Sequence, residues 1–409
     1  MNGHAPTNDS ANPAARLMQT LPRHRPFVVV WLAVFISIAG IGMVSPLLPK
    51  FAEDMGASGT WLGLIFSGYA FTQVPLMPVV GRLSDRLGKK LFLAVGLLLY
   101  VTAAAGYMWA PGYRELFIFR LVSGAGAAMV IPTAYAYIGD LTPRGREGRY
   151  MGIFNIAMVA GYGIGPTLGG LVYDNYGMHA AFASMCIMSG VGFLVVLLFL
   201  PRGTPPAHVS SAKEPSSGFA PLLRDSTMRA IMIYMLVWGL AYGAVYTFLP
   251  VFMTGAWGTS LSQVGMVLSV RSVLNGTLNY PFGWLADRMN RAFLVTLGLA
   301  MMAAGVCLIP WVGGFVGILV LFVAIGILET VAMPAGNAIT VDTGRRLGMG
   351  SVMSLFNMAN SSAVIVGAMA GASIERSVGI TWVFPAAGGA VAVGAVVFNL
   401  LMRRAGQCG

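Results

Sequence analysis

The stretch GRLSDRLGKK, residues 81–90, lies between two long apolar runs and carries five charged residues. A related stretch, GWLADRMNRA, occurs at 283–292, again between apolar runs and 202 positions later. Both copies contain the pattern Gly-x-Leu-x-Asp-Arg. A charged pattern that recurs after half the length of the chain indicates two similar halves.

Composition places the chain in a membrane. Of its 409 residues, 57% are hydrophobic and only 10% are charged, and the mean hydropathy is +0.76, whereas a soluble domain carries about 25% charged residues. A helix needs about 20 apolar residues to cross a bilayer. These runs are too long and too continuously apolar for barrel strands, so the sequence predicts an all-α membrane protein of twelve transmembrane helices. The twelve runs are 27–49, 61–80, 91–110, 115–138, 150–173, 180–200, 227–253, 262–282, 292–311, 315–340, 350–373 and 380–402.

The basic residues mark one side of that membrane. With a cytoplasmic N-terminus, twenty of the 25 Lys and Arg residues fall in the tails and loops of the cytoplasmic side. This asymmetry follows the positive-inside rule and predicts that both termini lie in the cytoplasm, with the chain in a bacterial inner membrane. The net charge of +11 is therefore a topology signal and does not support nucleic-acid binding.

A hydrophilic stretch divides the spans into two sets of six. Residues 201–226 are rich in Pro, Ser and Gly, which is typical of a flexible linker. They separate an N-terminal half, 27–200, from a C-terminal half, 227–402, with cytoplasmic tails at 1–26 and 403–409. The first tail is polar and has no small-residue cleavage site, so we expect no removable signal peptide. Each charged loop then joins the second and third spans of its half, as expected of a carrier built from two repeats.

The sequence lacks the side-chain groupings of an enzyme or of a metal site. Cys186, Cys307 and Cys408 have neither paired nor metal-ligand spacing, and the four histidines are scattered over tails and loops. No phosphate-binding loop, nucleophile elbow or zinc-protease motif occurs. We therefore expect no enzymatic activity, no metal and no cofactor, with a proton gradient as the source of energy.

Three motifs resemble those of the major facilitator superfamily. GRLSDRLGKK resembles the family's signature loop, and its second copy departs from it at Asn290, where the first has Gly88. RLVSGAGAA, 120–128, resembles the signature of the fourth span, and GYGIGPTLGG, 161–170, that of the fifth, which in this family is associated with antiporters and drug exporters. The resemblance covers essentially the whole chain. It implies two pseudo-symmetric six-helix halves and a proton-coupled exporter.

The resemblance also implies a cytoplasmic gate at the charged loop. Its two glycines would allow a tight turn, and Asp85 would face the N-terminus of span 11 near Gly350 and Ser351, where free N–H groups and the helix dipole favour an anion. Lys89 would then reach Asp140 at the cytoplasmic end of span 4. A solvated cluster that only sets the topology is the alternative. The gate residues are Gly81, Asp85, Arg86, Gly88, Lys89, Asp140 and Asp287.

Glycines recur at spacing four in the fifth-span motif. Gly161, Gly165 and Gly169 leave one helical face bare, which permits close helix approach in a membrane, and Pro166 removes a backbone donor and favours a bend. Ordinary small-residue packing is one explanation. The functional hypothesis is that this motif, with Gly170, lies in the contact between the halves and limits leakage.

Three charged residues lie deep inside spans, where each costs roughly 2.5–3.5 kcal/mol or more unless it is paired. They are Arg120 in span 4, Arg271 in span 8 and Glu329 in span 10, and Glu329 is the only carboxylate deep in any span. Burial raises the pKa of a carboxyl group and a nearby cation lowers it, so a paired buried acid can alternate between its two forms. We expect Glu329 to carry the proton, with Arg271 as its partner and Arg120 assisting from the other half. A static ion pair between spans 8 and 10 is the alternative.

Aromatic residues form one face of span 7, where Tyr234, Trp238, Tyr242 and Tyr246 recur at every fourth position. By family resemblance this face would line a central cavity. Aromatic walls suit flat apolar or cationic molecules, although packing or lipid contact would produce the same stripe. Further candidates for the cavity wall are Phe35, Tyr135, Asn275, Phe356, Asn357 and Asn360.

Together these observations predict a proton-coupled secondary transporter that exports amphipathic or drug-like small molecules by alternating access. Its partners would be the cargo, protons and the lipid bilayer, and it would act as a monomer. The first alternative is a lipid or lysolipid flippase on the same fold, which would need a wider lateral opening. The second is a proton-coupled importer of a polar metabolite, which would need more hydrogen-bonding groups in its cavity.

Overall fold

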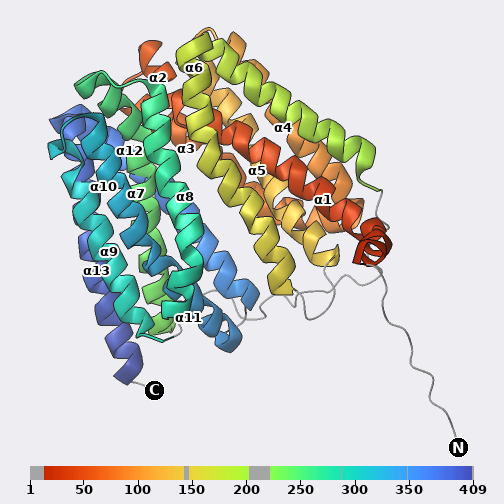
Figure 1. Cartoon of the computed structure of the whole chain (residues 1–409). Coiled ribbons are helices and arrows are strands. Elements are labelled where there is room, and N and C mark those ends of the chain that lie inside the picture. Colours follow the sequence, from red (N-terminus) through yellow and green to blue (C-terminus); the bar gives the residue numbers. More distant parts are fainter. Residues whose placement is uncertain (1–12, 142–146, 202–221, 287, 348, 408–409) are drawn as a thin grey trace, which may run out of the picture.

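The computed structural model describes residues 13–141, 147–201, 222–286, 288–347 and 349–407. Helices account for nearly all of these residues, and no strand occurs among them (Figure 1). In chain order the elements are α1 (Pro13–Val44), α2 (Leu47–Asp54), α3 (Thr60–Leu87), α4 (Lys89–Trp109), α5 (Tyr113–Leu141), α6 (Glu147–Phe199), η1 (Leu222–Arg224), α7 (Ser226–Trp257), α8 (Leu261–Ala286), α9 (Arg291–Leu308), η2 (Ile309–Trp311), α10 (Gly314–Thr330), α11 (Ala332–Leu347), α12 (Met349–Val378), η3 (Ile380–Trp382) and α13 (Val383–Gln407).

The predicted fold of twelve crossings is confirmed, with helix boundaries that differ from the apolar runs. Ten helical segments of the described chain are long and apolar enough to cross a membrane. The segment in α6 holds two crossings, because Gly177 (φ 81°, ψ 178°) interrupts the helix between them. The twelfth crossing is α8, a helix of 26 residues with Arg271 near its middle.

Helix also extends beyond the predicted ends of the spans. α1 begins at Pro13, inside the predicted N-terminal tail, and α13 continues to Gln407, inside the predicted C-terminal tail. Most of the predicted linker, 202–221, lies outside the described residues.

The two halves meet along two pairs of helices, α3 against α12 and α6 against α8. In Figure 1, α6 and α8 lie close at the end away from the chain termini and separate toward the end where the termini lie. A Cβ atom on Gly170 would lie 2.3 Å from the carbonyl oxygen of Leu261, and one on Gly63 would lie 2.8 Å from that of Ala368. Glycine therefore permits backbone contact between the halves at the end opposite the termini, which we call the closed end.

Asp174 adds a polar contact at this closed end. Its Oδ2 accepts a hydrogen bond of 3.1 Å from the backbone N–H of Ser262, the second residue of α8. The first N–H groups of a helix have no intrahelical partner, and the helix dipole favours a negative charge beside them. A carboxylate of the N-terminal half thus caps a helix of the C-terminal half.

We expect Asp174→Ala to weaken this closure, because α8 loses the capping contact from the other half, whereas its own capping pair, Ser260 with Gln263, and the glycine contacts remain. Loss of a cap costs typically about 1 kcal/mol, so the population separated at the closed end should rise about fivefold. Electron-spin distance measurements between labels at Tyr176 and Trp382, which are 79% and 55% exposed, would report it on a cysteine-free background. Asp174→Asn keeps the acceptor and should resemble the wild type. An unchanged distance distribution in the Ala variant would show that Asp174 does not hold the halves together.

Candidate functional site

A cavity of about 250 Å³ lies between the two halves. The N-terminal half contributes Phe66 from α3 and both Met158 and Tyr162 from α6. The C-terminal half contributes most of the polar groups. Its lining residues are Trp238, Tyr242, Tyr246, Arg271, Ser272, Asn275, Glu329 and Met333.

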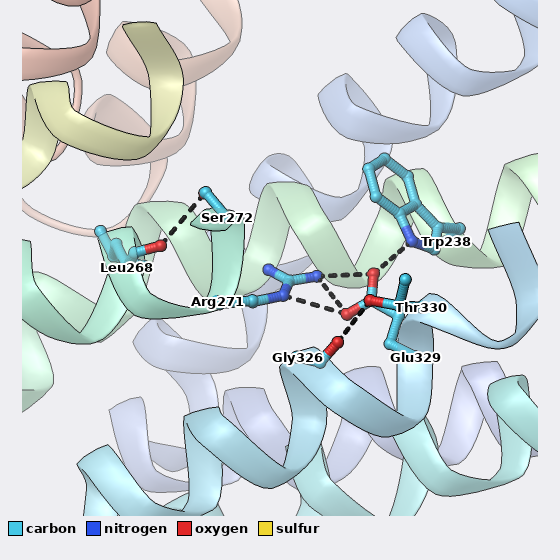
Figure 2. A network of polar contacts seen from close by, with 7 residues as sticks. All are labelled: Trp238, Leu268, Arg271, Ser272, Gly326, Glu329 and Thr330. Atoms are coloured by element: carbon cyan, nitrogen blue, oxygen red, sulfur yellow. Dashed lines mark hydrogen bonds and ion pairs between the residues drawn. The ribbon is translucent and has the colours of Figure 1, made fainter. Parts of the chain in front are cut away.

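A buried ion pair forms one side of this cavity (Figure 2). Arg271 of α8 donates to Glu329 of α10 from Nε to Oε2 at 3.0 Å and from Nη2 to Oε1 and Oε2 at 2.9 and 2.8 Å. The two side chains are 8% and 3% exposed. Two donor nitrogens directed at one carboxylate are the geometry in which Arg binds an anion most strongly, so the predicted partnership of Arg271 with Glu329 is present.

Trp238 of α7 completes the set of donors around the carboxylate. Its indole Nε1 donates to Glu329 Oε1 at 2.6 Å, beside the bond from Arg271 (Figure 2). The network therefore joins three helices, α7, α8 and α10, at one carboxylate. Donors from α7 and α8 thus hold this one carboxylate of α10 in place.

The hydrogen bonding of the helix that carries Glu329 is interrupted directly after it. α10 ends at Thr330 and α11 begins at Ala332. Pro334 has no N–H and cannot bond the carbonyl four residues earlier, at Thr330. The Thr330 hydroxyl also donates to the Gly326 carbonyl oxygen (Figure 2), a bond that favours bending of a helix. The chain does not unwind here, because Val331 between the two helices keeps helical backbone angles (φ −61°, ψ −37°).

Three of the four predicted aromatic residues of α7 line the cavity as a continuous stack. The rings of Trp238 and Tyr242 lie 5.4 Å apart at 16°, and those of Tyr242 and Tyr246 lie 4.0 Å apart at 23°. The Arg271 guanidinium lies 5.8 Å from the centre of the Tyr246 ring. Tyr234 is buried elsewhere, with its ring 6.4 Å from that of Phe398, so its predicted place in the cavity wall is wrong.

Of the other predicted wall residues, only Asn275 lines this cavity in the described structure. Phe35 stacks on Trp31 with ring centres 5.5 Å apart. The Tyr135 hydroxyl donates to Asn155 at 2.6 Å. For these two residues, and for three on α12, a place in a cavity wall stays a prediction. The three are Phe356, Asn357 and Asn360.

Sequence reasoning missed the residues by which the N-terminal half reaches the cavity. Tyr162 lies between two glycines of the fifth-span motif, and Pro166 of the same motif also lines the cavity. Phe66 faces it from α3, and Met158 lies one turn before Tyr162. The spacing-four glycines of α6 could have predicted Tyr162. If the glycine face of the helix packs against a neighbour, the residues between the glycines lie on other faces.

Arg120 does not join the ion pair. Its Nε donates to the Ile65 carbonyl oxygen at 3.1 Å, and its guanidinium lies 5.5 Å from the centre of the Tyr69 ring. In the described part of the chain it has no carboxylate at ion-pair distance, although it is only 3% exposed. The structure thus shows no contact through which Arg120 would assist Glu329.

The charged loop is in part as expected. Gly88 (φ 97°) forms the turn between α3 and α4, and Lys89 forms an ion pair with Asp140. Gly81 lies inside α3, so the expected turn at that residue was wrong, and Arg86 is exposed at the end of the helix. The side chain of Asp85 lies outside the described structure, as do those of Gly350 and Ser351 and the whole of Asp287, so the capping contact stays a prediction.

The second half contains the counterpart of this ion pair. Arg291 at the start of α9 pairs with Asp342 of α11. Both residues lie 202 positions after Lys89 and Asp140, the same shift that separates the two charged loops. The internal repeat could have predicted this pair, because a shift of 202 positions converts Lys89 and Asp140 into Arg291 and Asp342.

The glycines of the fifth-span motif serve two different contacts. Cβ atoms on Gly161, Gly165 and Gly169 would lie 2.2 to 2.9 Å from atoms of α1, within the same half. Gly170 faces Leu261 of α8, and the carbonyl oxygen of Pro166 lies 2.1 Å from where a Cβ on Gly265 would be. The expectation that the spacing-four glycines form the contact between the halves was therefore wrong, because Gly170 and Pro166 form it.

Known proteins resemble this chain along most of its length. An uncharacterised MFS-type transporter of Methanocaldococcus jannaschii is 25% identical over 86% of the chain and 92% of its own length. Multidrug resistance protein 2 of Bacillus subtilis is 24% identical over 67% of the chain and 70% of its own length. The quinolone resistance protein NorA of Staphylococcus aureus is 30% identical over 47% of the chain and 48% of its own length.

Solved structures share the fold at low sequence identity. A bacterial homologue of the human lysosomal transporter Spinster, solved in an inward-facing and unoccupied conformation, superposes with a TM-score of 0.78. It is 14% identical, and the match covers 93% of this chain and 97% of that one.

The family model of the Major Facilitator Superfamily matches residues 30–256 and again 252–406, one match for each half. The chain therefore belongs to the Major Facilitator Superfamily.

Proposed function

We propose that this transporter exports amphipathic, drug-like small molecules in exchange for protons. The observation that carries the proposal is the contact of one buried carboxylate, Glu329, with both Arg271 and the aromatic wall through Trp238. A proton on Glu329 would remove negative charge from this network and loosen it. The same step would change the wall against which the cargo rests.

The walls of the cavity favour a flat cargo. The stacked rings of Trp238, Tyr242 and Tyr246 offer a continuous aromatic surface, opposite Phe66 and Tyr162 of the other half. Aromatic faces bind planar apolar or cationic molecules by stacking and cation–π contacts. The drug-resistance relatives from Bacillus and Staphylococcus support this class of cargo.

Two other cargoes fit the fold less well. A lipid or lysolipid flippase would need a larger space that opens laterally to the bilayer, whereas this cavity measures about 250 Å³, slightly below the roughly 300–1,000 Å³ of pockets for small molecules. An importer of polar metabolites would bind its cargo through Ser45, Ser272, Asn275 and the tyrosines of the wall. The drug-resistance relatives favour an exporter over it.

The proposal includes the setting in which the exchange occurs. The transporter would lie in a bacterial inner membrane as a monomer, with both termini in the cytoplasm, as the positive-inside rule indicates. Since the halves are closed at the end opposite the termini, the described state would receive cargo from the cytoplasm. The proton gradient would be its only source of energy.

We expect Glu329→Gln to abolish uphill efflux, because glutamine keeps the shape of the side chain but cannot exchange a proton. Purified protein in liposomes with an imposed pH gradient, with ethidium as a fluorescent aromatic cargo, would measure the uphill flux. Downhill movement of ethidium should persist, which separates loss of coupling from misfolding. Glu115→Gln, a carboxylate in the first turn of α5 outside the cavity, is the matched control and should retain uphill flux. Continued accumulation against the gradient by the Glu329 variant would show that the proton travels elsewhere.

We expect Tyr242→Ala to weaken cargo binding about fivefold to tenfold, because it removes the middle ring of the stack, and ring contacts contribute roughly 0.5–1.5 kcal/mol each beyond area burial. Tyr242→Phe keeps the ring and should bind nearly as the wild type does. Calorimetric titration of the purified protein with ethidium would measure both affinities. Equal affinity in the Ala variant would place the cargo away from this wall.

A further inference from the structure

A groove on the outside of the C-terminal half is a second cavity, separate from the central one. It encloses about 750 Å³ between α9 and α13, which run side by side at the edge of the molecule in Figure 1. None of its described lining residues lines the central cavity. Binding in this groove is therefore independent of the cargo that the central cavity takes.

The groove changes in character along its length. Its inner part is lined by small apolar side chains, among them Ala300, Ala304 and Ala392. Toward the terminal end, Asn399 donates from Nδ2 to the Thr296 hydroxyl oxygen at 3.2 Å. Arg403, which is exposed, lines the end of the groove nearest the C-terminus. A ligand that fits this gradient has an apolar body and a polar or anionic end.

The length of the groove matches one leaflet of a bilayer. From Arg403 to Ala392 the helix α13 advances eleven residues, which is about 16 Å at 1.5 Å per residue. The hydrocarbon thickness of one leaflet is about 15 Å, half of the usual 30 Å. The groove thus extends from the membrane surface to the middle of the bilayer, the distance that one acyl chain covers.

A positively charged side chain, that of Arg403, lies at the end of the groove near the C-terminus. In the described part of the chain, Arg403 has no carboxylate at ion-pair distance, and Arg404 beside it is also exposed. Basic groups where a helix leaves the membrane attract anionic headgroups. We propose that the groove between α9 and α13 binds one phospholipid with an anionic headgroup, its acyl chain along the alanines and its phosphate against Arg403.

Native mass spectrometry of the purified full-length protein tests this with two lipids of identical chains, phosphatidylglycerol and phosphatidylcholine. The wild type should retain phosphatidylglycerol about fivefold better, the preference expected of one basic side chain near a membrane surface. Arg403→Gln should reduce this preference to nearly none. Arg404→Gln is the matched control, since it removes the same charge one residue away and should keep most of the preference.

A second variant tests the groove itself. Ala304 is exposed and lines the groove, so Ala304→Leu fills it without entering the core and should reduce retention of both lipids. Equal retention of the two lipids by the wild type would overturn the proposal. So would an equal effect of the two arginine variants, or full lipid retention in Ala304→Leu. A dimer that disappears in Ala304→Leu would assign the groove to a second copy of the chain instead.

Discussion

The ion pair between Arg271 and Glu329 is the interaction on which the arrangement of the C-terminal half depends. Both side chains are almost fully buried at mid-membrane, where a lone charge costs several kcal/mol and a paired one is tolerated. Because Trp238 donates to the same carboxylate, three helices share one acid as their common polar contact. Loss of this contact would therefore act on three helices rather than on a single side chain.

The internal repeat explains how such a local change would reach both ends of the molecule. Each half has its own ion pair near the end where the termini lie, Lys89 with Asp140 and Arg291 with Asp342. These pairs hold helices within a half, whereas the halves contact one another through glycine-lined backbone, through Asp174 and through a hydrogen bond from the Thr167 N–H to Ser269. Rigid halves with few polar contacts between them are suited to rocking around a central site.

The sequence was sufficient to predict the fold and to single out Glu329, but not to predict most of the residues that line the cavity. Apolar runs, basic loops and the repeat predicted twelve crossings in two halves, and the scarcity of deep charges singled out Arg271 and Glu329. The wall depends on helix rotation and crossing, which residue type does not encode, so Tyr234 was misplaced while Phe66 and Tyr162 were missed. The glycines of α6 were assigned to the wrong contact for the same reason, since bare faces on two sides of one helix look alike in sequence.

We propose that cargo and proton compete for Glu329, so cargo binding should release protons into the solution. Purified protein in weakly buffered detergent solution, titrated with ethidium beside a pH indicator, would show how many protons leave for each cargo bound. Near the pH at which half of the protein carries the proton, the account predicts a release that approaches about half a proton per cargo and rises toward one at lower pH, as linkage requires. It predicts no release from the Glu329→Gln variant. Tight binding of ethidium to the wild type without release at any pH would contradict the account.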